Sequence, residues 1–544
     1  IPFTDEASIE NTIHCWAVML FLGYTNMVIA ERMLRLSPVA MRLELKEGVN
    51  NCSVINDSYN SDLGSLAIAL DFLNQQKQHP KRTLILSDIF QSGKNERELY
   101  KEVADLVKEK EVSRLIGIGE AISMQANQFD AERKFYKTTD EFLADYIGNI
   151  FSNETILLKG ARAFGFERIS RMLQQKAHET VLEINLNALI HNLNYYRSKI
   201  APGTKMMVMV KAFSYGSGGF EVANILQHHQ VDYLAVAYAD EGIELRKAGI
   251  IIPIMVMNSE EASYDTMIRH DLEPEIFSFR VLKLFEDAVK RSGRKDFPYP
   301  IHLKLDTGMH RLGFEEKEMN EIAVRIGNSK FLEVRSVFSH LAGSEEQAHD
   351  EFTRNQIKKF GEMSEVIRSC FDYPIFRHIL NSAGIVRFPG AQFEMVRLGI
   401  GLYGIGTNSE EQAQLKNVST LKTTISQIKN IPAGESVGYG RKFVTKKDMR
   451  IATVPIGYAD GLSRRLSNGK GKMIIKDKKA SIVGSVCMDM CMLDITDIQC
   501  SEGDEVIVFG SEYSAYEIAK DMDTIPYEVF TGISRRVKRV YFQE

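Results

Sequence analysis

Apolar and polar positions alternate along the first third of the chain in a strand, helix, strand, helix order. Four short apolar runs, each bounded by charged amphipathic segments, are typical of buried strands. They are residues 53–56, 82–87, 114–117 and 156–158. This alternation predicts a Rossmann-like, doubly wound α/β domain over residues 47–177. One long apolar helix, predicted at about 9–36, precedes it within residues 1–46.

A second series of strands begins near residue 178. Eight apolar runs, each followed by a helical pattern, predict a (β/α)8 TIM barrel over residues 178–418. They are residues 178–184, 205–211, 233–237, 252–257, 299–305, 334–340, 376–380 and 393–397. Beyond about Thr420 the helical patterns stop, and short strands follow at 450–455, 472–475 and 505–509. Residues 419–544 are therefore expected to form a C-terminal β domain.

Charge and cysteine usage narrow the class of protein. The net charge is −5 and basic residues are scattered, which argues against nucleic acid or a membrane surface as a partner. The six cysteines form neither a disulfide framework nor a zinc-binding pattern, so we expect no metal and a reducing, cytoplasmic location. The apolar stretch 15–30 is too short to span a bilayer, and the acidic start argues against a signal peptide. Because the chain lacks an initiator Met, we expect it to be part of a longer protein.

Lys211 is the first candidate for chemistry. It ends the apolar run 206–210 and precedes a glycine-containing turn. An amine at the mouth of a buried strand is favoured in its neutral form, which bond formation with a carbonyl requires. The alternative is a lysine whose stem merely leads out of a strand end. Other polar residues also follow predicted strands, on the face where barrels build active sites. They are Lys304, Asp306, His340, Asn381, Ser382 and Arg397.

Six segments resemble, in order, the motifs of bacterial alanine racemases. They are residues 210–216, 304–313, 378–383, 396–400, 457–461 and 487–489. The resemblance covers residues 178–544. It implies pyridoxal 5'-phosphate as the cofactor and a small amino acid as the substrate, with interconversion of L-alanine and D-alanine for peptidoglycan. It also implies a homodimer with shared active sites.

The resemblance assigns a role to each matching residue. Lys211 is implied to bind the cofactor covalently, and Tyr458 to act as the opposing acid/base, because racemisation needs a base on each face of the substrate. The cofactor-binding residues implied are Lys211, Tyr215, His340, Asn381, Ser382, Arg397, Gly399, Ile400 and Tyr527. The substrate-binding residues implied are Arg311, Met488 and Asp489.

Two cationic residues carry further implications. In the family pattern Arg397 donates a hydrogen bond to the pyridine nitrogen, which keeps that nitrogen unprotonated and favours simple proton exchange. In many family members the residue at Lys304 is carbamylated and positions Arg311. An unmodified Lys304 paired with Asp306 or another acid is the alternative. Three residues depart from the family pattern: Phe213, Ser217 and His310.

Other functions remain to be weighed against alanine racemisation. Serine or another small amino acid is an alternative substrate. A non-catalytic pyridoxal phosphate carrier of barrel form would lack Tyr458 and the β domain. A decarboxylase of the same architecture would place a glutamate at the pyridine nitrogen and carry a Cys-Asp-Glu motif, whereas this chain has Arg397 and reads Cys-Met-Asp at 487–489.

The first third has a looser resemblance, to the C-terminal domain of the Mur ligase that adds D-alanyl-D-alanine to the cell-wall precursor. Residues 42–44, 55–61 and 158–162 carry it, and Asn11 resembles an adenine-contacting asparagine of the ligase central domain. The chain contains no Gly-x-x-Gly-Lys-Thr phosphate loop. We therefore expect residues 1–46 to be a remnant of that central domain, and the ligase part to be inactive in this chain.

Overall fold

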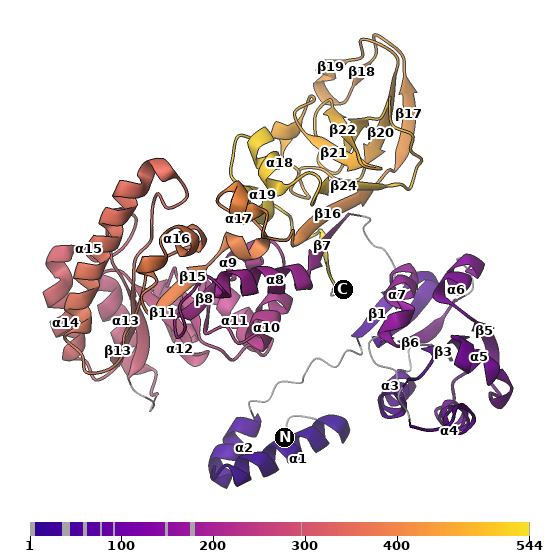
Figure 1. Ribbon diagram of the computed structural model, residues 1–544, viewed down its shortest axis with the longest axis horizontal. Coiled ribbons are helices and arrows are strands. Elements are labelled where there is room, and N and C mark those ends of the chain that lie inside the picture. The colour runs from indigo at the N-terminus through magenta and orange to yellow at the C-terminus, as the bar shows by residue number, and fades with distance from the viewer. Residues whose placement is uncertain are drawn as a thin grey trace. The chain divides into compact units, whose positions relative to one another are not determined.

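The computed structural model describes residues 6–34, 44–57, 62–76, 79–90, 93–146, 151–173, 180–294, 296 and 298–542. The chain divides into two compact units, Ile1–Ala177 and His178–Glu544 (Figure 1). Two parts of the ligase-like motifs, residues 42–43 and 58–61, lie outside the described residues. No helix of the described residues is long and apolar enough to cross a membrane.

The first unit contains a six-stranded sheet in the order β1-β2-β6-β3-β4-β5. Its strands are β1 Glu44–Gly48, β2 Cys52–Asp57, β3 Lys81–Ser87, β4 Arg114–Ile118, β5 Glu132–Tyr136 and β6 Glu154–Lys159. All neighbours are parallel except β1 and β2. The helices that follow strands β2 to β6 are α3 Leu63–Gln75, α4 Glu96–Glu109, α5 Glu120–Met124, α6 Thr139–Asp145 and α7 Glu167–Leu173. Two separate apolar clusters pack around the sheet, so the doubly wound fold is confirmed.

Two features of this unit differ from the sequence prediction. The single long helix is in fact two, α1 Glu6–Phe21 and α2 Asn26–Leu34, interrupted at Gly23, whose φ is +87°. A left-handed glycine ends a helix because it has no Cβ to clash. Strands β1 and β5 were not predicted. Most side chains of β5 are charged or polar, and its burial is low, so no apolar run marks it.

The second unit begins with an eight-stranded parallel sheet in the order β14-β13-β12-β11-β10-β9-β8-β15. Its strands are β8 Lys205–Met209, β9 Tyr233–Val236, β10 Ile254–Val256, β11 Leu272–Ile276, β12 Tyr299–Lys304, β13 Leu332–Phe338, β14 Phe376–His378 and β15 Met395–Leu398. The main barrel helices are α8 Leu186–Arg197, α10 Phe220–His228, α11 Ala239–Lys247, α12 Tyr264–Arg269, α13 Phe279–Arg291, α14 Met319–Gly327, α15 Asp350–Arg368 and α16 Ser382–Arg387. The amide of Arg397 donates to the carbonyl of Leu380 at 3.0 Å, linking the two ends of the sheet. The predicted TIM barrel is confirmed.

The membership of the barrel differs from the prediction by one strand. The run at 178–184 was predicted to be the first barrel strand, but β7, Val181–Asn185, instead pairs with strands of the β domain. The strand that takes its place in the barrel is β11, with the sequence Leu-Glu-Pro-Glu-Ile. Two acids and a proline disguise this strand, although all five residues are buried.

The β domain is built on a nine-stranded sheet in the order β17-β20-β23-β22-β21-β24-β16-β7-β25 (Figure 1). Its other strands are β16 Ser419–Thr424, β17 Gln427–Ile431, β20 Met449–Val454, β21 Lys472–Ile475, β22 Lys478–Val483, β23 Cys491–Asp494, β24 Glu505–Phe509 and β25 Lys538–Phe542. The expectation that helices stop after Thr420 is wrong. Helices α18, Ala515–Asp521, and α19, Pro526–Thr531, follow β24, and α19 contacts the turn that begins at Lys211.

Candidate active site

A cavity of about 500 Å³ opens where the barrel strands end. Nine of the predicted site residues line it: Lys211, Tyr215, Arg311, His340, Asn381, Ser382, Arg397, Gly399 and Tyr527. Tyr527 reaches it from α19 of the β-domain segment, so the cavity lies between the barrel and that helix. Five predicted residues are not among its lining: Lys304, Ile400, Tyr458, Met488 and Asp489. Ile400 follows Gly399 directly and is buried.

The turn that carries Lys211 is wound in the left-handed sense. Four successive non-glycine residues have positive φ: Ala212 at +51°, Phe213 at +56°, Ser214 at +49° and Tyr215 at +52°. Each such residue costs about 1–2 kcal/mol, so only the surrounding contacts can maintain the turn. The amide of Phe213 donates to Glu241 Oε1 at 3.3 Å. Gly216, at φ +79°, closes the turn where a Cβ would collide with the Phe530 carbonyl of α19.

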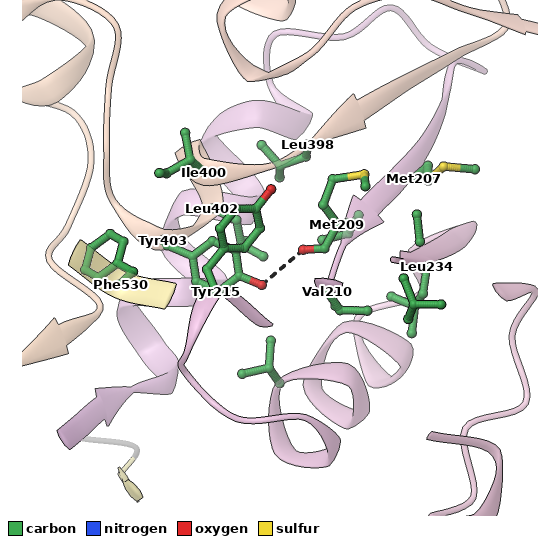
Figure 2. Packing of buried hydrophobic residues seen from close by; sticks show 14 of the residues in the cluster. Met207, Met209, Val210, Tyr215, Leu234, Leu398, Ile400, Leu402, Tyr403 and Phe530 are labelled. Carbon is green, nitrogen blue, oxygen red and sulfur yellow. Dashed lines mark hydrogen bonds between the residues drawn. The ribbon is translucent and has the colours of Figure 1, made fainter. Parts of the chain in front are cut away.

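Tyr215 is packed between two other tyrosines. Its ring centroid lies 4.8 Å from that of Tyr403 and 5.8 Å from that of Tyr527. The Tyr403 hydroxyl donates to the carbonyl of Met209 at 3.1 Å, which ties this aromatic group to the end of β8 (Figure 2). The strained turn is therefore held by a buried aromatic wall, and Lys211 keeps a fixed position between that wall and the barrel.

Backbone amides and hydroxyls converge at Gly399. The amides of Gly399 and Gly401 donate to Ser382 Oγ at 2.9 and 3.3 Å. A Cβ on Gly399 would lie 3.2 Å from the Tyr215 hydroxyl and 3.6 Å from Ser382 Oγ, so only glycine leaves this space open. Hydroxyls and amides around an open position are the donor set of a phosphate cradle. Nearby, Asn381 Oδ1 accepts the amide of Gly384 at 2.9 Å and caps α16.

Arg397 is a fixed, buried cation beside this cradle. Only 2 % of it is exposed. Its Nη1 donates to the His378 carbonyl at 3.0 Å, and its Nη2 donates to the carbonyls of Ser339 at 2.6 Å and Ile379 at 3.0 Å. Nη2 also lies 3.3 Å from His340 Nδ1. Burial lowers the pKa of Arg397 to about 10, which leaves the guanidinium charged at neutral pH.

The cations of the site disfavour one another's charged forms. Burial, followed by Arg311 and Arg397, lowers the pKa of Lys211 below its ordinary value. A lowered pKa increases the fraction of neutral amine, which is the form that bonds to a carbonyl carbon. Burial and the same arginines, together with Lys304, hold the pKa of His340 far below its ordinary value. His340 is therefore a neutral imidazole near neutral pH.

A chain of buried polar side chains crosses the barrel interior to Arg397. Glu273 Oε2 lies 2.8 Å from His302 Nε2, and His302 Nδ1 lies 2.6 Å from Ser336 Oγ. Ser336 Oγ lies 2.9 Å from His378 Nε2, and His378 Nδ1 lies 2.7 Å from Arg397 Nη1. No role was predicted from the sequence for Glu273, His302, Ser336 or His378. The available signal was a polar residue inside each of several apolar strands.

Lys304 pairs with Glu275 and not with Asp306. Its Nζ lies 3.4 Å from Glu275 Oε1 and 4.4 Å from the ring centroid of Phe338. Asp306 instead accepts the amide of Gly308 and caps the following turn. Burial lowers the pKa of Lys304 to about 8, and Glu275 opposes that change. The acid that the sequence left unnamed is thus a residue of β11, the strand that was missed.

Tyr458, Met488 and Asp489 lie together on the β domain. The amide of Tyr458 donates to the Cys487 carbonyl at 3.0 Å, which joins the two loops that carry these residues. Tyr458 is 43 % exposed and Met488 53 % exposed, unusually open for large side chains in predicted binding motifs. The structure therefore does not bring them to the cavity of Lys211 in the same chain.

Arg536 fastens the same two loops through their acids. Its Nε lies 2.7 Å from Asp460 Oδ1, and its Nη2 lies 2.7 Å from Asp489 Oδ1. Asp460 Oδ2 in turn accepts the amide of Gly457 at 2.9 Å, beside Tyr458. Arg536 was not predicted from the sequence, because its two partners become neighbours only in the folded β domain.

The three departures from the family pattern lie outside the cavity lining. The ring of Phe213 packs beneath the guanidinium groups of Arg535 at 4.8 Å and Arg539 at 5.5 Å. Ser217 is buried, and the side chain of His310 is exposed. These residues therefore support the site from behind or border its surroundings without facing the cavity.

Family comparisons agree with this division of the chain. The alanine racemase N-terminal domain matches residues 184–407, and the alanine racemase C-terminal domain matches residues 418–541. The Mur ligase glutamate ligase domain matches residues 41–162.

Individual relatives match over nearly their whole length. Alanine racemase 2 of Caldanaerobacter subterraneus subsp. tengcongensis is 37 % identical over 371 residues, covering 66 % of this chain and 94 % of the relative. The alanine racemase of Clostridium difficile 630 superposes with a TM-score of 0.64 at 36 % identity, covering 68 % of this chain and 97 % of that one. The alanine racemase of Bartonella henselae with covalently bound pyridoxal phosphate superposes with a TM-score of 0.61 at 27 % identity, covering 67 % and 99 %. The chain therefore belongs to the alanine racemase family, which consists of pyridoxal-phosphate-dependent isomerases, and carries a Mur ligase domain ahead of its racemase part.

Proposed function

We propose that this enzyme interconverts L-alanine and D-alanine by exchanging the Cα proton between two bases, and that its D-alanine serves peptidoglycan synthesis. The observation that carries the proposal is the placement of Lys211. Its amine, with a lowered pKa, faces a cavity that also holds an open cradle at Gly399 and the buried cation Arg397. The activity of the named relatives supports the choice of alanine.

Pyridoxal phosphate fits the residues that line the cavity. The open space at Gly399, bordered by the Tyr215 and Ser382 hydroxyls, would hold its phosphate, and Lys211 would hold its carbonyl carbon. The remaining groups of the proposed cofactor site are His340, Asn381, Arg397, Ile400 and Tyr527. When bound, the cofactor withdraws electrons from Cα and so acidifies its proton. A guanidinium that stays charged, Arg397, would keep the ring nitrogen unprotonated and limit competing reactions.

Proton exchange at Cα requires a base on each face of the substrate. Lys211 would hold or release the proton on one face, and Tyr458 on the other. Tyr458 does not line the cavity of its own chain and is 43 % exposed. We therefore propose a homodimer in which each copy inserts its Tyr458 into the cavity of the other. Met488 and Asp489 would accompany it and, with Arg311 of the cavity, bind the substrate.

We propose that one cytoplasmic polypeptide carries both the racemase and a ligase-like domain. The racemase would consist of a barrel, residues 178–418, and a β domain, residues 419–544. Strand β7 lies in the first range but pairs with strands of the β domain. Residues 47–177, with the remnant 1–46, would form a ligase domain without ligase activity, because no phosphate-loop sequence is present to hold ATP. If the purified chain added D-alanyl-D-alanine to the cell-wall precursor in the presence of ATP, this proposal would be wrong.

The direct test of the proposed activity is racemisation by the purified chain with added pyridoxal phosphate. We expect L-alanine and D-alanine to interconvert in both directions, and L-serine to react more slowly. L-Lysine, which is much longer, serves as a negative control for the small substrate pocket. Faster conversion of serine than alanine would make serine the substrate, and no conversion of any of them would refute the proposed function.

A further inference from the structure

The barrel end of the cavity gathers more cations than buried anions. Four cationic residues act on one another there: Lys211, Lys304, Arg311 and Arg397. The acids that line the cavity mouth, Glu345 and Glu346, are exposed to solvent. Glu275 is different, because it is only 1 % exposed. Cations that are buried together require a buried counter-charge.

Glu275 occupies the position from which it can supply that charge. Strand β11 places it in register with His302 of β12, two residues before Lys304. Its Oε1 lies 3.4 Å from Lys304 Nζ, as an ion pair without an aligned hydrogen bond. The other acid near Lys304 in sequence, Asp306, is occupied by the amides of Gly308 and His310.

The influence of Glu275 extends beyond its pair with Lys304. Its carboxylate raises the pKa of Lys211 against the lowering effect of burial and the two arginines. It likewise raises the pKa of Arg397. Burial raises the pKa of Glu275 itself, and Lys304, Arg311 and Arg397 oppose that rise. One carboxylate is thus coupled to all the cations of the site.

We propose that Glu275 is a positioning residue that supplies the fixed negative charge of this site and keeps Lys304 as an unmodified ammonium. The inference rests on the proposed racemase site, but Glu275 takes no part in the proton exchange. A carbamate on Lys304 would place a second buried anion beside the Glu275 carboxylate, and two like charges in close contact disfavour each other. The Glu275 carboxylate on β11 therefore supplies the buried negative charge that a carbamylated Lys304 would otherwise supply.

The first test is the chemical state of Lys304 in the holoenzyme. We would equilibrate the protein with ¹³C-bicarbonate and record its ¹³C NMR spectrum, with Lys304→Met as the reference that lacks the amine. The expected wild-type spectrum has no carbamate resonance. A carbamate resonance that disappears in Lys304→Met would overturn the proposal. This measurement does not depend on activity, so it decides the question even if alanine proves not to be the substrate.

The second test uses Glu275→Gln, which keeps the shape of the side chain and removes its charge. Because Glu275 raises the pKa of Lys211, the acidic limb of the kcat profile, which reports the bases of the substrate complex, should move to lower pH, by about one unit for a nearby charge. The groups coupled to Glu275 are Lys211, Lys304, Arg311 and Arg397, and His302 lies opposite it in register. His340, which is coupled to the same four cations, also bears on this profile. Glu275→Asp, which retains the charge, should restore the limb. Asp306→Asn, the matched neutralisation of the neighbouring acid, should not move it.

A charge left unpaired in the interior can also destabilise the fold, so a double variant is needed. Glu275→Gln with Lys304→Met removes both members of the buried pair, and we expect it to recover the melting temperature lost in Glu275→Gln. The pH profile should stay shifted in the double variant, because Lys211 still lacks its counter-charge. A wild-type pH profile in folded Glu275→Gln would overturn the positioning role, and a profile restored by Lys304→Met would confine Glu275 to the ion pair and overturn it likewise.

Discussion

The barrel cavity around Lys211 differs in burial and rigidity from the exposed patch of the β domain, which consists of Tyr458, Met488 and Asp489 on two neighbouring loops. Around Lys211 the groups are buried, bonded and strained into place, as the left-handed turn and the three carbonyls on Arg397 show. Tyr458 and Met488 lie half-exposed on a loop pair joined by two backbone hydrogen bonds and by Arg536. The first region is built from residues of one chain that surround a cavity. The second exposes large side chains to solvent, which is the basis of the shared-site proposal.

The largest expected effect is the loss of Lys211. Lys211→Ala should abolish both racemisation, by a factor on the order of 10⁴ or more, and the visible absorbance of covalently bound cofactor, because the amine supplies both the attachment and one base. Absorbance spectra and racemisation rates measure the two effects. Lys205→Ala, at the opposite end of β8, is the matched control and should change neither. If Lys211→Ala kept both the visible absorbance and the activity, the role assigned to Lys211 as cofactor attachment and base would be wrong.

The next effect separates the two regions. Tyr458→Phe should reduce racemisation by roughly 10²–10⁴-fold, the usual contribution of a positioned acid/base, while the bound cofactor stays. Tyr439→Phe, another exposed tyrosine of the β domain, should leave the rate unchanged. If Tyr458→Phe interconverts alanine at a near-normal rate in both directions, some other group serves the second face of the substrate.

A smaller but more diagnostic effect comes from mixing the two inactive variants. In a shared-site homodimer, a heterodimer of Lys211→Ala and Tyr458→Phe subunits holds one intact site, so random reassortment should restore about a quarter of the sites. Racemisation of co-refolded mixtures, with heterodimers verified by mass, measures this. Verified heterodimers without activity would show that Tyr458 acts within its own chain, and so would a fully active monomer.

The contrast between the two regions also explains what the sequence could predict. Five of the nine predicted cavity residues were found because they follow apolar strands, and the strand ends of a parallel barrel meet on one face: Lys211, His340, Asn381, Ser382 and Arg397. Tyr215, Arg311, Gly399 and Tyr527 came from the family resemblance alone. Strand β11 was missed because Glu273 and Glu275 look like surface residues. They are buried only because His302 and Lys304 of the adjacent strand pair with them, and strand pairing joins residues that no local pattern connects.

The wrong assignment of β7 to the barrel has a similar cause. Its apolar run correctly predicted a strand, but a local pattern does not show which sheet a strand joins. Its partners β16 and β25 lie more than two hundred residues further along the chain. Helix α19 was not predicted because its local signal is weak: it is six residues long and begins with a proline. The resemblance nevertheless implied a cofactor-binding role for Tyr527, and Tyr527 lines the cavity.

The smallest expected effect concerns how the exposed patch keeps its shape. Arg536 binds Asp460 below the Tyr458 turn and Asp489 beside Met488, and both acids raise the pKa of its guanidinium. The Asp460 side chain is only 1 % exposed, so Arg536→Ala would leave a buried carboxylate without its ion-pair partner and should lower the melting temperature. The same substitution should lower kcat/KM for alanine by roughly tenfold, because small misplacements of catalytic groups reduce rates steeply.

This last variant tests whether the patch is prearranged before it meets a second copy. Cofactor absorbance should be retained in Arg536→Ala, since the cavity around Lys211 is untouched, and the loss should fall on the steps that need the β-domain loops. Arg441→Ala is the matched control, because Arg441 is an exposed arginine of the same domain whose side chain bonds only to Ser436 in the described contacts. If both variants keep wild-type kcat/KM, then Arg536 has no part in ordering the two loops, and their backbone hydrogen bonds or the contact with the partner order them instead.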